Sequence, residues 1–201
     1  MAMKLMAKGA EAEVYRTSIF GIDAVLKDRK PKPYRIKELD EGIRAARTRS
    51  EAKITYIADS IGVKVPNVLF VKRYQLFMTY VEGIQMSALM QQGDKISKAL
   101  MAKVGKYLGK LHNAGIAHGD FTPANILVDT GGEPWVIDFG LSSILDSIEE
   151  KALDLLLMKR SIGKESYFAF IKSYSAEAHS SKAILSRLSE IESRGRYNER
   201  A

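Results

Sequence analysis

The stretch of residues 116–140 reads IAHGDFTPANILVDTGGEPWVIDFG. It sets Asp120 five positions before Asn125, and a third polar residue, Asp138, opens the tripeptide DFG. The apolar runs ILV and WVI lie between Asn125 and Asp138, with a glycine-rich turn segment between the two runs. This pattern predicts two strands joined by a turn. Asn125 and Asp138 then lie at the same end of a hairpin.

The polar residues of this hairpin suit a magnesium ion and a triphosphate. Mg²⁺ prefers hard oxygen ligands in near-octahedral geometry, which a carboxylate at Asp138 and the amide oxygen of Asn125 supply. Asp120 is expected where an attacking hydroxyl or water must be oriented. The order H-x-D-x-x-x-x-N, then D-F-G, is typical of protein-kinase-like phosphoryl transfer. The alternative is an ordinary hairpin with capping and turn acids, and the presence of both halves in order disfavours it.

Length and composition bound the class of protein. The chain has 201 residues, of which 46% are hydrophobic and 27% charged, so we expect one globular domain, short for a full protein kinase. No apolar run approaches the roughly 20 residues of a membrane span, and no secretory signal is evident, so a cytoplasmic location without membrane contact is expected. The absence of cysteine excludes disulfides and thiolate sites. A formal net charge of +7 favours an acidic partner such as RNA, or simply reflects a solvated surface.

The first third of the chain predicts a small β-rich lobe. A strand over Arg16–Ile19, a turn at Phe20–Gly21 and a second strand ending at Lys27 are the simplest interpretation. A lysine at the end of such a strand is typical of the position that contacts nucleotide phosphates as a point charge.

The segment KGAEAEVY before these strands is expected to cover the phosphates. It departs from G-x-G-x-x-G, since it has one glycine and two carboxylates, which repel a triphosphate unless a cation intervenes. The expected nucleotide-binding residues of this segment are Lys8, Gly9, Ala10, Glu11, Ala12, Glu13, Val14 and Tyr15.

A long helix is predicted over Glu38–Ile61, because apolar residues recur there at three- and four-residue spacing. In a kinase-like lobe one helical glutamate holds the strand lysine toward the phosphates, and Glu51 is the predicted partner of Lys27. The alternative is a surface glutamate that balances neighbouring arginines. The linker at residues 28–37 has two prolines and five basic residues, which suits either contact with a phosphate backbone or a solvated connection.

Two strands, over residues 67–72 and 75–79, lead into a hinge at Thr79–Gly83. Backbone groups of Thr79, Tyr80 and Val81 are expected to bind the edge of an adenine. Met78 is expected to line the back of the nucleotide pocket, with a plain core position as the alternative.

The second half predicts helices. An amphipathic helix over Ser97–Asn113 leads into the catalytic loop, and three further helices are expected over residues 148–162, 164–175 and 183–193. Leu153 and Phe168 are among the residues predicted to face their core. Asp154 either anchors the backbone of the catalytic loop or is an exposed helix acid.

These elements predict an α+β, protein-kinase-like fold with two lobes in one domain of residues 1–201. The β-rich N-lobe covers about residues 1–80, the hinge 79–83, the reduced helical C-lobe about 84–193 and a basic tail 194–201. No A-P-E motif follows DFG, and Gly119 replaces the arginine of H-R-D, so control by activation-loop phosphorylation is not expected.

The chain resembles the small atypical kinase subunit of the KEOPS complex, the PRPK family, in its stand-alone archaeal form. The acidic loop and the short C-lobe are similar to the pattern of that family. The segments that carry the resemblance are KGAEAEVY (8–15), KPYRIKELD (32–40), RTRSEA (47–52), HGDFTPAN (118–125), DFGLS (138–142) and RGR (194–196).

The resemblance implies a magnesium-dependent ATPase and atypical serine/threonine kinase, able to autophosphorylate, with ATP and Mg²⁺ as cofactors. Its partners would be the catalytic subunit that installs threonylcarbamoyl on adenosine 37 of ANN-decoding tRNAs, the other KEOPS subunits, and tRNA. By resemblance, Asp120 accepts the proton, Asn125 and Asp138 hold magnesium, Lys27 contacts phosphate and Glu51 orients Lys27.

Two other functions are compatible with the same residues. One is a structural nucleotide-binding scaffold that docks partner subunits and tRNA. The other is a small-molecule kinase of the aminoglycoside phosphotransferase type, which shares H-x-D-x-x-x-x-N but needs a larger substrate-binding helical lobe than residues 141–201 offer.

Overall fold

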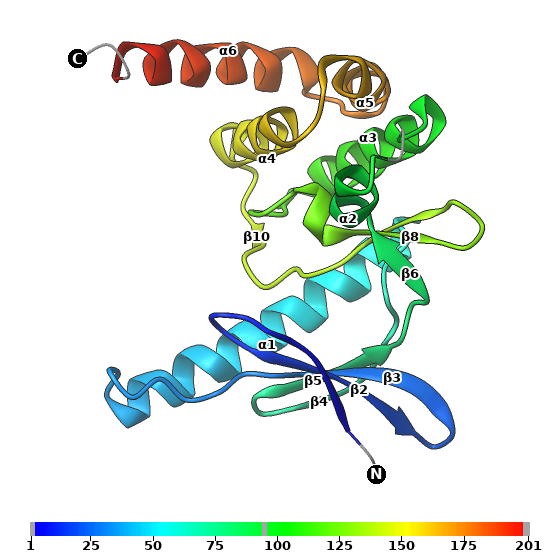
Figure 1. The fold of residues 1–201 in the computed structure, drawn as a ribbon. Helices are drawn as coiled ribbons and strands as arrows, with labels where there is room; N and C mark the ends of the chain where they lie inside the picture. Colours follow the sequence, from blue (N-terminus) through cyan, green and yellow to red (C-terminus); the bar gives the residue numbers. More distant parts are fainter. Residues whose placement is uncertain (1–2, 94–95, 199–201) are drawn as a thin grey trace.

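A computed structural model describes residues 3–93 and 96–198, and Figure 1 shows that they form two lobes. The N-terminal lobe consists of an antiparallel five-stranded sheet in the order β1-β2-β3-β5-β4 and one long helix beside it. Its elements are β1 (Lys4–Lys8), β2 (Glu13–Ile19), β3 (Ile22–Asp28), α1 (Lys37–Ser60), β4 (Val68–Lys72) and β5 (Gln75–Thr79).

The β2–β3 hairpin places Lys27 in the sheet. Its turn residues Phe20 and Gly21 both have positive φ, at 49° and 80°, which matches the right-handed twist of the paired strands. Val14 lies opposite Lys27 in the β2–β3 ladder, and Leu76 of β5 lies opposite it on the other side. Lys27 therefore sits on a central strand with both neighbours fixed.

The C-terminal lobe is mainly helical, and its short strands form a three-stranded sheet, β6-β8-β9, and a pair, β10-β7. Its elements are β6 (Gly83–Gln85), α2 (Met86–Gln91), α3 (Lys98–Asn113), β7 (Ile116–Ala117), a 3₁₀ turn (Pro123–Asn125), β8 (Ile126–Asp129), β9 (Pro134–Val136), β10 (Ser143–Ile144), α4 (Ile148–Ser161), α5 (Lys164–Glu177) and α6 (Ser181–Asn198).

Close packing of α3 on α5 organises the core of this lobe. A Cβ atom at Gly105 would lie 2.2 Å from the carbonyl oxygen of Phe170, and one at Gly109 would lie 2.8 Å from the Cβ of Glu177. These two glycines on one face of α3 let the helix backbones approach directly. The buried side chains of Phe170 and Tyr174 then fill the space toward the catalytic loop.

The α+β fold with a β-rich first lobe and a helical second lobe is confirmed. Strand β1 was not predicted, and α6 continues through Asn198, so most of the predicted tail is helical, while residues 199–201 lie outside the described residues. The predicted core positions Leu153 and Phe168 are wrong, because these side chains are 41% and 69% exposed. Within the described residues, no helix has the length and apolar character needed to span a membrane.

Candidate active site

A cavity of about 570 Å³ lies between the lobes and is lined from both sides. The N-lobe contributes Lys27 of β3 and Glu51 of α1, and the C-lobe contributes Asn125 and Asp138, which lie together at the open end of the β8–β9 hairpin. The predicted proximity of the last two residues follows from the hairpin, in which the amide of Ile137 donates to the carbonyl oxygen of Asn125 at 3.0 Å. A cavity of this size suits a nucleotide.

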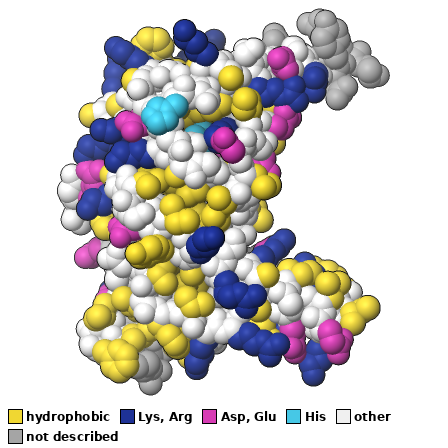
Figure 2. All heavy atoms as spheres, turned by 180° about the vertical axis from the view of Figure 1, so that it is seen from behind, with side chains coloured by type: hydrophobic (Ala, Val, Ile, Leu, Met, Phe, Trp, Pro, Cys, Tyr) yellow, Lys and Arg dark blue, Asp and Glu magenta, His cyan; other side chains and the backbone are white. Residues whose placement is uncertain are grey.

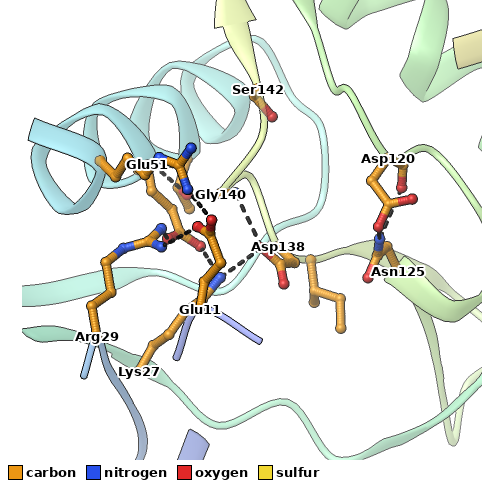
Figure 3. Close-up of polar contacts among 12 residues, drawn as sticks. Glu11, Lys27, Arg29, Glu51, Asp120, Asn125, Asp138, Gly140 and Ser142 are labelled. Carbon is orange, nitrogen blue, oxygen red and sulfur yellow. Dashed lines mark hydrogen bonds and ion pairs between the residues drawn. The ribbon is translucent and has the colours of Figure 1, made fainter. Parts of the chain in front are cut away.

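Lys27 is the centre of the charged half of the site, as Figure 3 shows. Its Nζ lies 2.7 Å from Glu51 Oε1 and 2.6 Å from Asp138 Oδ1, so the predicted Lys27–Glu51 contact is present. Burial alone would lower the pKa of Lys27, but the charges of Glu51 and Asp138 outweigh burial and raise that pKa. Burial likewise raises the pKa of Asp138, and the charge of Lys27 reverses the effect and lowers it. Both groups are therefore ionised at neutral pH.

A second buried cation, Arg29, was missed by the sequence analysis. Its Nη2 lies 2.6 Å from Glu51 Oε2 and its Nη1 lies 3.3 Å from Glu11 Oε2. Glu11 also accepts a hydrogen bond from Arg47 of α1. Arg29 follows Lys27 by two positions, and the two-residue period of an extended chain was the signal that places both side chains on one face.

The catalytic loop holds Asp120 and Asn125 together. Asn125 Nδ2 donates to the carbonyl oxygen of Asp120 and to its Oδ2, both at 2.8 Å. Since the amide nitrogen is used for these two bonds, the amide oxygen of Asn125 is left for a cation. With the carboxylate of Asp138 across the hairpin, the donor set consists of the hard oxygens that magnesium prefers.

Asp154 of α4 fixes the backbone of this loop. Its side chain is fully buried and accepts hydrogen bonds from the amides of His118 and Gly119, at 2.7 and 2.8 Å, and it lies 3.2 Å from the ring of His112. The anchoring role considered for Asp154 is therefore the one observed. Gly119 has φ 81°, and a Cβ there would lie 2.4 Å from the carbonyl oxygen of Leu141, which explains why no arginine occupies this position.

The hinge residues predicted to bind a base line the cavity. Met78, Thr79, Tyr80 and Val81 all face it, so Met78 is a wall residue of the pocket. The amides of Thr79 and Tyr80 donate to the carbonyl oxygens of Asn67 and Asp23. Among the described hinge residues, Val81 is therefore the first whose amide is left for the edge of a base.

The phosphate-covering segment contributes less to the wall than predicted. Of residues 8–15, Val14 alone lines the cavity. Glu13 and Tyr15 flank Val14 on β2 and hydrogen-bond to each other on the opposite face, as the alternation of side chains along a strand requires. Met6 and Ala7 of the unpredicted strand β1 line the cavity instead. The N-terminal sequence carries no alternation that could have indicated them.

Comparison with known proteins gives a consistent result. The family model described as RIO domain matches residues 13–182. The KEOPS complex subunit Bud32 of Pyrococcus abyssi is 36% identical, over 99% of this chain and 98% of that protein. A probable bifunctional tRNA threonylcarbamoyladenosine biosynthesis protein of Methanothermobacter thermautotrophicus is also 36% identical, over 97% of this chain but 37% of its own length. The chain thus spans little more than a third of such bifunctional relatives.

One solved structure supports the fold. The Rio2 kinase–ADP/Mg²⁺–phosphoaspartate complex from Chaetomium thermophilum superposes with a TM-score of 0.65, covering 91% of this chain and 66% of that one, at 18% identity. The two lobes and the matched family model define a RIO-type atypical kinase domain. The chain belongs to the RIO-domain kinase family, in which the archaeal KEOPS subunit Bud32 is a relative over its full length. The resemblance drawn from the sequence motifs is confirmed.

Proposed function

We propose that the protein is a magnesium-dependent ATPase and atypical serine/threonine protein kinase that supports threonylcarbamoylation of adenosine 37 in ANN-decoding tRNAs as a KEOPS subunit. The observation that carries the proposal is the position of Lys27, which bridges Glu51 and Asp138 at the wall of the cavity between the lobes. The full-length similarity to a KEOPS subunit and the names of the bifunctional relatives support the tRNA-modifying context.

Each residue of the site has a role in this proposal. The amide oxygen of Asn125 and the carboxylate of Asp138 hold magnesium, which neutralises phosphate charge when it is bound. Lys27 exchanges its contact with Asp138 for a phosphate oxygen, while Glu51 keeps its ammonium in place. Asp120 accepts the proton of the attacking hydroxyl or water.

The proposed partners are the tRNA-modifying catalytic subunit, other KEOPS subunits and tRNA, in the cytoplasm. Figure 2 shows an open notch between the lobes on one side of the molecule, with Lys and Arg side chains along the border formed by the N-terminal lobe. Basic side chains beside a cleft favour contact with a phosphate backbone, in keeping with the net charge of +7.

Phosphate release from ATP and Mg²⁺ tests the proposal, measured on the protein alone and with the tRNA-modifying subunit and tRNA. We expect hydrolysis that rises with the partner and tRNA and is abolished in Asp120→Ala. If hydrolysis stays flat while labelled phosphate moves onto a protein serine, protein phosphorylation is the primary activity and the coupled ATPase is rejected. Turnover that is unchanged in Asp120→Ala contradicts the assignment of the site itself.

A further inference from the structure

A chain of alternating charges links the phosphate-covering segment to the cavity. Figure 3 shows that Glu11, Arg29, Glu51, Lys27 and Asp138 follow one another through hydrogen bonds between charged side chains. With Arg47, which donates to Glu11, this chain contains three acids and three bases, so its formal charges balance. Arg29 is its central link, because it is the residue that joins Glu11 to Glu51.

Arg29 is suited to this link by its burial and its shape. Its side chain is 3% exposed, and a buried charge is stable only when it is paired and hydrogen-bonded. The planar guanidinium uses two separate nitrogens, Nη2 for Glu51 and Nη1 for Glu11, whereas a shorter lysine would have a single nitrogen for both carboxylates. The main chain is also fixed, since the amide of Arg29 donates to Tyr74 at 3.0 Å and its carbonyl oxygen accepts from Arg44 at 3.1 Å.

The guanidinium also lies against the turn that carries Asp138. A Cβ atom at Gly140 would lie 3.2 Å from Arg29 Nη2 and 2.9 Å from Asp138 Oδ1. The same Oδ1 accepts a hydrogen bond from the amide of Gly140 at 3.1 Å. Three segments that are distant in sequence therefore meet at Arg29: the acidic loop, helix α1 and the DFG turn.

We infer that Arg29 is a positioning residue, which holds Glu51 toward Lys27 and holds the loop that carries Glu11 over the phosphate site. The inference rests on the proposed function and deepens it. When phosphate replaces Asp138 as a partner of Lys27, Glu51 Oε2 keeps its contact with Arg29. The other carboxylate oxygen, Glu51 Oε1, therefore stays directed at Lys27.

The same arrangement explains the acidic loop, which is otherwise repulsive to a triphosphate. Burial would raise the pKa of Glu11, but the hydrogen bond and charge of Arg47, with the charge of Arg29, lower it, so the carboxylate is ionised. Its negative charge is balanced by its pairing with two arginines. The carboxylate thereby becomes an anchor for the loop.

Binding measurements on Arg29→Lys test the inference. A lysine has one nitrogen in place of the two that hold Glu51 and Glu11 from different positions, so we expect Mg²⁺–ATP to bind about tenfold more weakly by calorimetry, which is about 1.4 kcal/mol. Binding of adenosine, which has no phosphates, should change by less than about twofold, since Arg29 does not line the base-binding wall. A merely structural role would weaken both ligands equally. The matched control is Arg73→Lys, because Arg73 pairs with Glu41 on the exposed surface.

A second variant tests whether Arg29 acts through Glu11. In Glu11→Gln, which changes a part-exposed side chain, we expect faster hydrogen exchange at the amides of residues 8–12 and no change in α1. The double variant Glu11→Gln, Arg29→Lys should bind Mg²⁺–ATP more weakly than the wild type, by a factor smaller than the product of the factors measured for the two single variants. Unchanged exchange in Glu11→Gln, or independent effects in the double variant, contradicts the inference.

The outcomes separate the inference from the proposed function. A wild-type protein that does not bind Mg²⁺–ATP overturns both. A wild-type protein that binds Mg²⁺–ATP, with the same ratio of ATP to adenosine affinity in Arg29→Lys, overturns the positioning role of Arg29 alone.

Discussion

The two halves of the site are built in different ways. In the N-terminal lobe, Lys27 and Glu51 are held by ion pairs whose partners come from distant segments. In the C-terminal lobe, the loop of Asp120 is held by hydrogen bonds to a single buried carboxylate, Asp154, and by the ring of His118 between two phenylalanines. Charged partners can be exchanged, whereas this buried network is complete without a ligand.

This difference indicates which half must change when a nucleotide enters. Asp138 Oδ1 lies 2.6 Å from Lys27 Nζ, so this contact is the one that changes in the proposed exchange, in which Asp138 contacts an ion and Lys27 a phosphate. The amide of Asn125 and the backbone of the loop need no such change, because Asp120 and Asp154 already orient them. The catalytic loop of the C-terminal half is thus preorganised, and the contact between Lys27 and Asp138 is the part of the proposed site that rearranges around a ligand.

The largest expected effect is that of Asp138→Asn on ATP turnover. The amide is isosteric but carries no charge, so it binds magnesium weakly and gives Lys27 no second anion. We expect turnover to fall at least about 100-fold in phosphate-release assays. Stability should change little, because Lys27 keeps its contact with Glu51.

Thermal unfolding of Asp138→Asn separates this loss from damage to the fold. A melting temperature near that of the wild type with turnover lost places the effect in the chemistry. Turnover above about a tenth of the wild-type rate contradicts the assignment of Asp138 as a metal ligand.

The next largest effect is expected for Asp154→Asn, which tests whether the catalytic loop of the C-terminal half is held in place by this carboxylate. Asp154 now accepts hydrogen bonds from the amides of His118 and Gly119 and contacts the ring of His112. The side-chain NH₂ of an asparagine would face one of these groups, so two donors would meet and one would lose its partner. Leaving a buried donor without a partner costs about 2–4 kcal/mol in unfolding free energy, measured by urea titration. Displacement of the catalytic loop should also lower turnover, by about 10- to 100-fold.

Asp59→Asn is the matched control, because Asp59 is an exposed acid near the end of α1. Its unfolding free energy should stay within about 0.5 kcal/mol of the wild type. Equal stability of the two variants would show that the hydrogen bonds of Asp154 do not hold the lobe together.

The sequence predicted the parts of the site that depend on local order. The hairpin spacing brings Asn125 to Asp138, and the strand and helix patterns bring Lys27 to Glu51. Residue roles that depend on packing between distant segments were not predictable in this way. Arg29 looked like one of several basic residues in a linker, and its burial follows from three segments that meet only in the folded chain.

The same limit applies to the core of the helical lobe. Periodicity selected Leu153 and Phe168, which are exposed, and missed Leu155 and Phe170, which are fully buried. The helices α4 and α5 are apolar on more than one side, so the pattern does not fix which side faces inward. The direct contact at Gly105 selects Phe170, because the two helix backbones touch there.

Acid pH should weaken the preorganised half through its two buried histidines. Burial lowers the pKa of both His112 and His118 in the folded state below the ordinary value. The unfolded chain therefore binds protons that the folded chain does not, and the unfolding free energy falls as the pH drops below about 6.5. Each histidine ring lowers the unfolding free energy by up to about 1.4 kcal/mol for each pH unit below its unfolded pKa, and urea titrations between pH 5 and 7 measure this slope.

His112→Gln should remove one of these two contributions and make the pH dependence less steep. His179→Gln is the control, because it removes an exposed histidine instead of a buried one. A slope that is the same in His112→Gln and the wild type would show that this ring takes up protons equally in both states.

The smallest expected effect lies in the C-terminal lobe but outside the cavity. Tyr107 of α3 donates to Glu133 Oε1 at 2.8 Å, and Glu133 also pairs with Lys103, so Tyr107→Phe leaves no unpaired charge. The loss of one hydrogen bond should lower the unfolding free energy by about 1 kcal/mol, with ATP turnover within twofold of the wild type. Glu133 lies at the turn of the β8–β9 hairpin, whose other end carries Asn125 and Asp138. A tenfold loss of turnover would mean that the hairpin transmits movement to those residues, and the C-terminal half would then be less rigid than its buried hydrogen bonds indicate.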